Sequence, residues 1–181
     1  MKRPLILLLG VAALVVAALT LIPSTGATTS EALWPGSLCV RSEQIIFSCV
    51  VRRANSRTAR DKLASLCASR TLTKNDGYLQ YRFGLPGKVE LQYPSTRTGT
   101  QQLFQYTHYM RFQVDLTEIN FTIENHQYQI FDSYNGEEKP AISDEGVNVT
   151  LSDGTTNATF NCRAKAKADY SMLSDVLQNH E

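Results

Sequence analysis

The sequence carries almost no net charge and few of the residues that usually perform chemistry. Its 181 residues hold 18 Lys and Arg against 17 Asp and Glu, a formal charge of +1 at pH 7. A dedicated nucleic-acid-binding domain is usually clearly basic, so this balance argues against that class. There are only three histidines, and the Gly-x-Ser-x-Gly, His-Glu-x-x-His, Walker and Rossmann patterns are all missing. We therefore expect no enzyme and no cofactor.

The composition also excludes several structural classes. Apolar residues make up 43% of the chain and charged residues 19%, which is enough apolar material for a packed core. Collagen-like, disordered and coiled-coil chains have different compositions. The length predicts one domain, with room for a targeting segment.

The first 27 residues have the order of a secretory signal peptide. A basic Met1–Arg3 precedes an apolar run from Leu5 to Ile22, and Thr25-Gly26-Ala27 supplies the small residues of a cleavage site. We expect a signal peptide over 1–27 and a single mature domain over 28–181, periplasmic or secreted, with no stable membrane insertion after cleavage. The alternative is a retained anchor, for which this run of 18 residues would be short.

The four cysteines all lie in the predicted mature domain: Cys39, Cys49, Cys67 and Cys162. No Cys-x-x-Cys pair and no nearby histidine supports zinc, and an even number in an exported chain favours two disulfides. Cys49 and Cys162 each end an apolar alternation near one end of the domain, so we favour Cys49–Cys162 with Cys39–Cys67. Cys49–Cys67 is the competing pair, because both flank one hairpin centred near Arg57–Thr58.

Apolar side chains recur at every second position, which is the signature of strands. The predicted strands lie within 45–51, 79–83, 89–93, 104–114, 119–123, 128–130, 147–151 and 158–162. Eight or nine strands joined by turns such as Pro86–Gly87 favour an all-β fold, an antiparallel barrel or sandwich. Helical spacing of Met172, Leu173, Val176 and Leu177 predicts a short C-terminal helix. Residues 28–38 are expected to form a loose leader.

The longest alternation, from Phe104 to Val114, predicts the central core strand. Phe104, Tyr106, Met110 and Phe112 should point inward together, and His108 on the same face should be a buried core group rather than a catalyst.

Charge is unevenly distributed along the mature chain. Residues 31–97 hold 11 Lys and Arg against 5 Asp and Glu, whereas residues 98–162 hold 2 against 9, which gives +6 and −7. This pattern indicates either two halves that attract each other or a molecule with a basic and an acidic face, which would steer a charged protein partner.

Three loops concentrate this charge and are the candidate partner-binding segments: Arg52–Lys62, Ser69–Gly77 with Lys88 nearby, and Asp132–Lys139. The carboxylate spacing in the last loop does not fit a twelve-residue calcium loop, so we expect no metal there. The individual candidates are Arg52, Arg53, Arg57, Ser69, Lys88, Glu137 and Glu138.

The most distinctive stretches are Leu66–Ser69, Gly77–Gly84 and Pro86–Leu91. Together with Phe104–Asp115 and Tyr128–Pro140 they resemble small exported bacterial β proteins of the proteobacterial type, a family that brings no activity with it. The chain is more weakly similar to the periplasmic and membrane-bound c-type lysozyme inhibitors, which insert a serine loop and a Lys-Gly strand into the enzyme cleft. That resemblance assigns those parts to Ser69 and Lys88, although this chain reads Gly87-Lys88 and has no Ser-Gly-x-x-Tyr string.

These observations favour an exported binding protein over an enzyme. We expect an inhibitor or immunity-type protein whose partner is a secreted hydrolase or toxin in the bacterial envelope. A disulfide-linked β scaffold suits this role because preorganised loops bind with little ordering cost. The alternatives are a β-barrel that carries a small ligand or lipid, or a structural envelope protein.

Overall fold

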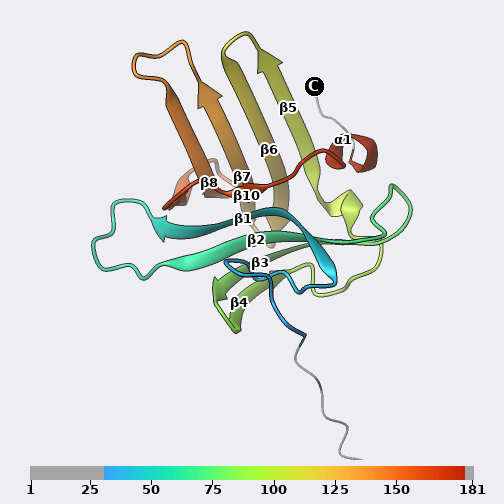
Figure 1. Ribbon diagram of the computed structural model, residues 1–181. Helices are drawn as coiled ribbons and strands as arrows, with labels where there is room; N and C mark the ends of the chain where they lie inside the picture. Colours follow the sequence, from blue (N-terminus) through green and yellow to red (C-terminus); the bar gives the residue numbers. More distant parts are fainter. Residues whose placement is uncertain (1–30, 178–181) are drawn as a thin grey trace, which may run out of the picture. The chain divides into compact units, whose positions relative to one another are not determined.

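Residues 31–177 are described by the structure, a computed structural model, and they form one curled antiparallel sheet (Figure 1). The strands follow the order β4-β3-β2-β1-β9-β8-β7-β6-β5, and a tenth strand, β10, pairs with β1. The strands are β1 (Glu43–Arg53), β2 (Lys62–Ser69), β3 (Leu79–Leu85), β4 (Lys88–Tyr93), β5 (Gln105–Arg111), β6 (Val114–Ile123), β7 (His126–Asn135), β8 (Ile142–Leu151), β9 (Thr156–Cys162) and β10 (Lys167–Ala168).

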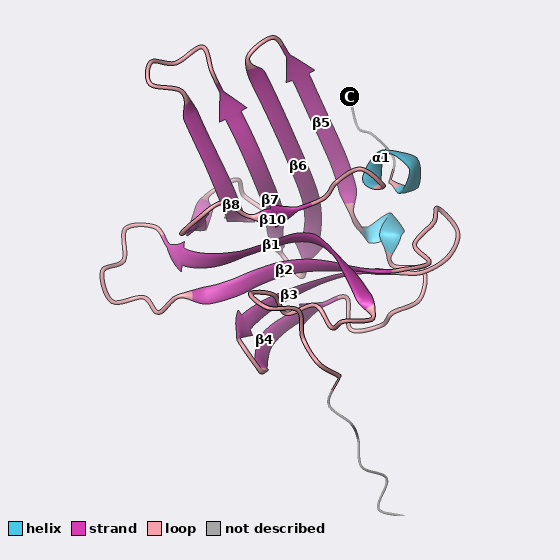
Figure 2. Cartoon of the chain, in the orientation of Figure 1, coloured by secondary structure: helices cyan, strands magenta, loops and turns pink. Residues whose placement is uncertain are grey.

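Strands dominate the secondary structure (Figure 2). The helices among the described residues are a single 3-10 turn, η1 (Gln101–Leu103), and a one-turn helix, α1 (Leu173–Val176). The predicted all-β class with a short C-terminal helix is thus confirmed. The predicted signal peptide and its cleavage site lie outside the described residues. Within residues 31–177 no helix has the length and apolar character needed to cross a membrane.

The curl of the sheet places two sets of strands across each other. In Figure 1, β5–β8 stand nearly upright and β1–β4 cross below them. The inner face of the curl carries the core, in which the rings of Tyr81 and Phe121 lie 5.0 Å apart and those of Phe104 and Phe121 lie 5.1 Å apart. Leu173 and Val176 of α1 are buried in the same cluster, as their helical spacing predicts.

Much of β1–β3 is buried on both faces, because the segment before β1 covers part of their outer face, although Val50 near the end of β1 is 40% exposed. Ser37, Leu38 and Cys39 are at most 2% exposed, and the Leu38 amide donates a 3.0 Å hydrogen bond to Ser65 Oγ. The expectation of a loose leader is therefore wrong for this part of the chain. A covalent link and buried polar contacts hold it against the sheet.

Both favoured disulfides are confirmed. Cys39 is bonded to Cys67, which fixes the leader on β2, and Cys49 is bonded to Cys162, which links β1 to β9. Two cysteines 113 residues apart in sequence thus link the neighbouring strands β1 and β9.

The predicted core strand from Phe104 to Val114 is two strands. Phe112 and Gln113 form a tight turn between β5 and β6, with Gln113 at a φ of 61°. Phe104 and Tyr106 are buried as predicted, but Met110 is 70% exposed and Phe112 83% exposed. The apolar alternation continues beyond the part of the strand that the opposite wall of the curl covers. The prediction that Met110 and Phe112 lie in the core, which rested on this spacing alone, is therefore wrong.

The sheet order separates the two charged halves of the sequence. The basic residues 31–97 contain β1–β4, whereas the acidic residues 98–162 contain β5–β9, and the two sets occupy opposite halves of the strand order. The charge asymmetry of the sequence is therefore also an asymmetry of the folded sheet.

Candidate functional site

Strands β5–β8 extend beyond the core, and their inner face there forms a cleft of about 630 Å³. The strand register explains its composition. Asp115 lies opposite Tyr134, which lies opposite Ser143, and the next row joins His108, Thr117, Asp132 and Glu145. The row after that is Tyr106, Ile119, Ile130 and Val147, which belongs to the core. Polar side chains thus change to apolar ones at the same level on four strands, and the polar rows line the cleft.

The segment after β9 closes one side of this cleft. β10 holds the segment on β1, with Phe47 opposite Ala168. Tyr170 Oη donates a 3.2 Å hydrogen bond to Asp132 Oδ2, and the Ala166 amide donates to Glu145 Oε2. Lys165 also lines the cleft. The C-terminal segment therefore supplies both donors that orient the acidic groups and the lysine that partly offsets their charge.

The charge of the cleft is negative. It contains the carboxyl groups of Asp115, Asp132 and Glu145 against the single ammonium group of Lys165, a formal charge of −2. His108 Nε2 lies 2.9 Å from Asp115 Oδ1, which places an imidazole at the rim. The prediction that His108 is a buried core group is wrong, because its side chain is 38% exposed.

Burial raises the pKa of the Asp132 carboxyl, and the negative charge of Asp115 raises it further. The hydrogen bond from Tyr170 and the charge of Lys165 act in the opposite direction without cancelling the effect. Burial likewise raises the pKa of the Tyr170 hydroxyl, together with the nearby charge of Asp132. A positively charged group in the cleft would relieve this cost by neutralising Asp132.

Exposed apolar side chains lie at the open end of the cleft. Met110 is in the same row as Asp115 and Tyr134 on the cleft face, and Phe112 follows in the turn of the β5–β6 hairpin. Met110 is 70%, Phe112 83% and Tyr134 46% exposed, whereas Ile142, opposite Asn135, belongs to the other face of the sheet. The two hairpin ends are held together, since Arg111 forms a two-pronged ion pair with Glu137 and the Gly136 amide donates to Gln113 O at 2.7 Å. The result is an apolar rim around an acidic floor.

The candidate residues chosen from the sequence are not gathered at one end of the sheet. Arg52, Arg53 and Arg57 lie at the β1–β2 loop, whereas the Ser69–Gly77 connection lies at the opposite end of β2. Arg52 Nε is 2.6 Å from Asp61 Oδ1, and Arg53 donates to the Asn157 carbonyl. Of the set, only Glu137 and Glu138 lie next to the cleft, in the loop between β7 and β8.

The two residues singled out by the lysozyme-inhibitor resemblance are far apart. Ser69 is 9% exposed, and its Oγ accepts a 3.1 Å hydrogen bond from the Tyr78 amide, which closes the loop before β3. Lys88 lies at the other end of β3, where it pairs with Leu85. Strand β3 has seven residues, so about 20 Å separates the two positions.

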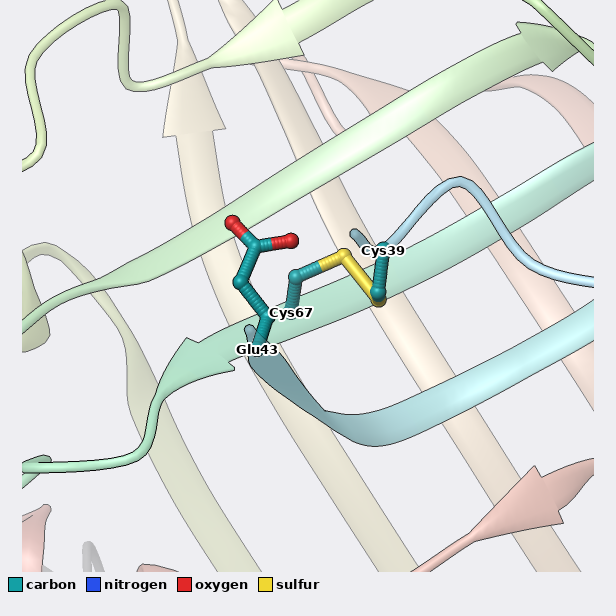
Figure 3. A group of neighbouring side chains, drawn as sticks. All are labelled: Cys39, Glu43 and Cys67. Atoms are coloured by element: carbon teal, nitrogen blue, oxygen red, sulfur yellow. A yellow bond between two sulfur atoms is a disulfide. The ribbon is translucent and has the colours of Figure 1, made fainter. Parts of the chain in front are cut away.

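A group of potential metal ligands, Cys39, Glu43 and Cys67, lies within the buried layer on the outer face (Figure 3). Both sulfur atoms are bonded to each other, and the Glu43 carboxylate is bound by Arg82. All of these ligand atoms are already engaged, so the geometry is that of a structural cluster.

Sequence reasoning missed most of the cleft residues. Asp115, Glu145 and Tyr170 were not singled out, and Asp132 was assigned to a loop although it lies in β7. One sequence pattern could have indicated the cleft. On successive strands a polar residue stands two positions before the first buried apolar residue, as in Thr117/Ile119 and Glu145/Val147. It becomes specific only when the strand register is known.

No family model, curated protein or solved structure matches this chain.

Proposed function

We propose that this chain is an exported binding protein that inhibits or neutralises a secreted hydrolase or toxin in the bacterial envelope, with the β5–β8 cleft and its rim as the contact surface. The observation that carries the proposal is the combination of an acidic floor with exposed apolar side chains at its edge. Exposed aromatic residues and methionine are enriched in protein interfaces, and charged groups beside them set the association rate and the choice of partner.

The scaffold favours binding because the surface is largely preorganised. Its floor lies on hydrogen-bonded strands, and the Arg111–Glu137 ion pair joins the two hairpins that form the rim. The two disulfides stabilise the sheet below it. A partner therefore orders few additional groups on binding, which leaves more of the interaction energy for affinity.

The negative charge of the cleft indicates the kind of partner surface that it would bind. The acidic half of the sheet and the formal charge of −2 in the cleft would attract a protein that presents lysine or arginine side chains among apolar ones. Long-range attraction of this kind raises the association rate and weakens as salt increases. The cytosol is not the expected location, since two disulfides are compatible with an exported protein.

The alternative of an apolar-ligand carrier is less well supported. An interior that holds a lipid needs an open apolar cavity. In the described residues the inner face is occupied by packed rings, including Phe121 against Tyr128 at 5.2 Å and against Tyr93 at 5.7 Å.

The test is binding and inhibition with a panel of basic envelope hydrolases, c-type lysozyme among them. Glu145→Gln, and Glu137→Lys with Glu138→Lys, should slow association about three- to tenfold at low salt. Glu124→Gln, in the turn that follows β6, is the matched control and should leave the rate unchanged. A hydrolase inhibited equally well by wild type and all cleft variants would place the contact surface elsewhere. No binding to any member of the panel would refute the proposed target class.

A further inference from the structure

A second pocket lies between the β1–β2 loop and the inner face of the sheet. It measures about 400 Å³, within the usual range for small-molecule sites. Three apolar side chains form its floor and three cationic ones its rim: Val51, Phe83 and Phe160, with Arg53, Arg60 and Lys62. No residue that lines it carries a carboxyl group. Its chemistry is thus opposite to that of the acidic cleft.

The floor is formed where the sheet curls back on itself. Phe83 belongs to β3 and Phe160 to β9, two strands that are separated by β2 and β1 in the sheet order. Their rings nevertheless meet edge to face with centroids 5.2 Å apart. Val51 is 1% exposed beneath them. The pocket therefore has a well-packed apolar base that extends from the core.

The rim has uncompensated positive charge. Lys62 is paired with Glu90, and its Nζ also lies 5.2 Å from the Phe83 ring centre. Arg53 and Arg60 form no salt bridge with any carboxylate among residues 31–177. The nearby Asp61 is engaged by Arg52. Arg53 donates one hydrogen bond to the Asn157 carbonyl. Its remaining donors and the Arg60 guanidinium are thus available to an anion above an apolar base.

We propose that this pocket binds a small anionic amphiphile, a carboxylate or phosphate group on a short apolar body. A guanidinium group presents several donors in a planar fork that matches these anions. The apolar body would lie against Phe83 and Phe160, where it removes apolar surface from water. Since the pocket is small and partly enclosed by the β1–β2 loop, the ligand is a soluble monomer rather than a lipid headgroup in a membrane. The site is independent of the proposed function of the acidic cleft.

The test is titration of the purified protein with sodium octanoate and with octyl phosphate, followed by amide and aromatic NMR shifts and by calorimetry. The pocket should give saturable shifts at Phe83, Phe160 and the β1–β2 loop. Octylammonium and 1-octanol have the same chain without the anion and should bind at least about tenfold more weakly.

Three arginine variants, at the end of β1 and in the β1–β2 loop, provide the decisive comparison. Arg60→Gln should weaken octanoate binding about tenfold, and Arg53→Gln should do the same, because each removes a charged donor. Arg57→Gln makes the same change in the same loop outside the pocket and should keep the wild-type affinity. These side chains are exposed, so folding should be unaffected.

Three results would overturn the proposal. Equal affinity for octanoate and octylammonium would show that charge is not recognised. Equal loss with Arg57→Gln and Arg60→Gln would show only diffuse attraction to a basic loop. Sedimentation with phosphatidylglycerol vesicles without saturable binding of either soluble amphiphile would identify a membrane-surface site instead.

Discussion

Arg82 and Glu43 form a two-pronged ion pair in the interior, with Nη2 at 2.6 Å from Oε1 and Nη1 at 2.7 Å from Oε2. Both side chains are at most 3% exposed. Arg82 also donates to the Leu38 carbonyl at 2.9 Å, and Glu43 Oε2 accepts the Val40 amide at 2.8 Å. The pair therefore connects β1 and β3 to the leader that covers them.

Removing one partner of this pair should be strongly destabilising. Arg82→Met leaves the buried Glu43 carboxylate with only the half-exposed Arg97, 3.8 Å away, as a counter-charge, and losses of this kind cost about 3–5 kcal/mol. Urea unfolding should show this as a lower midpoint with an unchanged slope. The double variant Glu43→Gln/Arg82→Met should recover part of the loss, because no unpaired charge remains. A single variant as stable as wild type would show that water reaches the carboxylate.

Acid stability should depend on Glu43. Burial raises the pKa of its carboxyl, but the hydrogen bonds and charge of Arg82, with hydrogen bonds from Tyr78 and Val40, outweigh this and lower it below the ordinary 4.5. The stability that this group contributes is therefore complete above about pH 4.5 and is lost as the pH falls through the lowered value.

Tyr78→Phe tests this linkage without removing either charge. It deletes the 2.8 Å hydrogen bond from Tyr78 Oη to Glu43 Oε1, so the folded-state pKa of Glu43 should rise toward its ordinary value. The acid-unfolding midpoint, followed by circular dichroism, should then move to higher pH. Tyr109→Phe removes an exposed hydroxyl and should not move it. Coincident acid transitions for wild type and Tyr78→Phe would contradict the assignment.

Truncation of two phenylalanines, one buried in the core and one exposed on a hairpin, should have different effects on stability. Phe121 is 4% exposed and contacts four aromatic rings, so Phe121→Ala should cost about 3–5 kcal/mol of unfolding free energy. Phe112 is 83% exposed, and Phe112→Ala should cost less than about 0.5 kcal/mol. Thermal or urea unfolding decides between them, and a similar loss for both would mean that the turn at Phe112 is misplaced.

The contrast between Phe121 and Phe112 shows which parts of the core the apolar alternation can predict. Alternation identified most strands, and Cys49 and Cys162 were paired because each ends such a pattern. It overlooked β2, where small residues such as Ala64 and Ser65 are buried on both faces and leave no period-2 signal. It also extended the core to Phe112, because local spacing does not reveal where the opposite wall of the sheet ends.

The cleft was harder to predict than the fold for a related reason. Asp115, Asp132 and Glu145 come from three strands, and only the register places them in two adjacent rows of one face. A shift of one residue would turn each to the other face. The charge imbalance indicated that this half of the chain is acidic, but pairing of the strands is needed to gather the carboxylates.

The two disulfides should differ in their contribution to stability. Cys49–Cys162 closes a separation of 113 residues and Cys39–Cys67 one of 28. In the chain-entropy description each stabilises by about 2–5 kcal/mol, and the longer loop by about 1 kcal/mol more. Paired Cys→Ala variants measured by urea unfolding should follow that order, and alkylation of the native protein should label no thiol. The reverse order would indicate that Cys39–Cys67 acts mainly by holding the leader in place.

The charge of Asp132 should lower the stability of the folded protein and strengthen the binding of a basic partner. Its pKa is raised in the folded protein, chiefly by burial and further by the charge of Asp115, so the folded state holds the proton more tightly than the unfolded chain. For such a group folding is favoured at low pH, and this contribution is lost as the pH rises through the raised value.

Asp132→Asn keeps an oxygen that can accept the Tyr170 hydrogen bond but removes the charge. It should therefore increase stability at pH 7, by less than for a fully buried carboxylate because Asp132 is only partly buried, and have little effect near pH 3, where the wild-type carboxyl is protonated. The same variant should bind a basic partner more weakly at low salt, with a difference that shrinks as salt rises. Urea unfolding at both pH values and association rates at two salt concentrations provide the measurements. A variant that is destabilised at pH 7 would show that the Asp132 charge is favourably compensated within the cleft, and the proposed cost of its burial would be wrong.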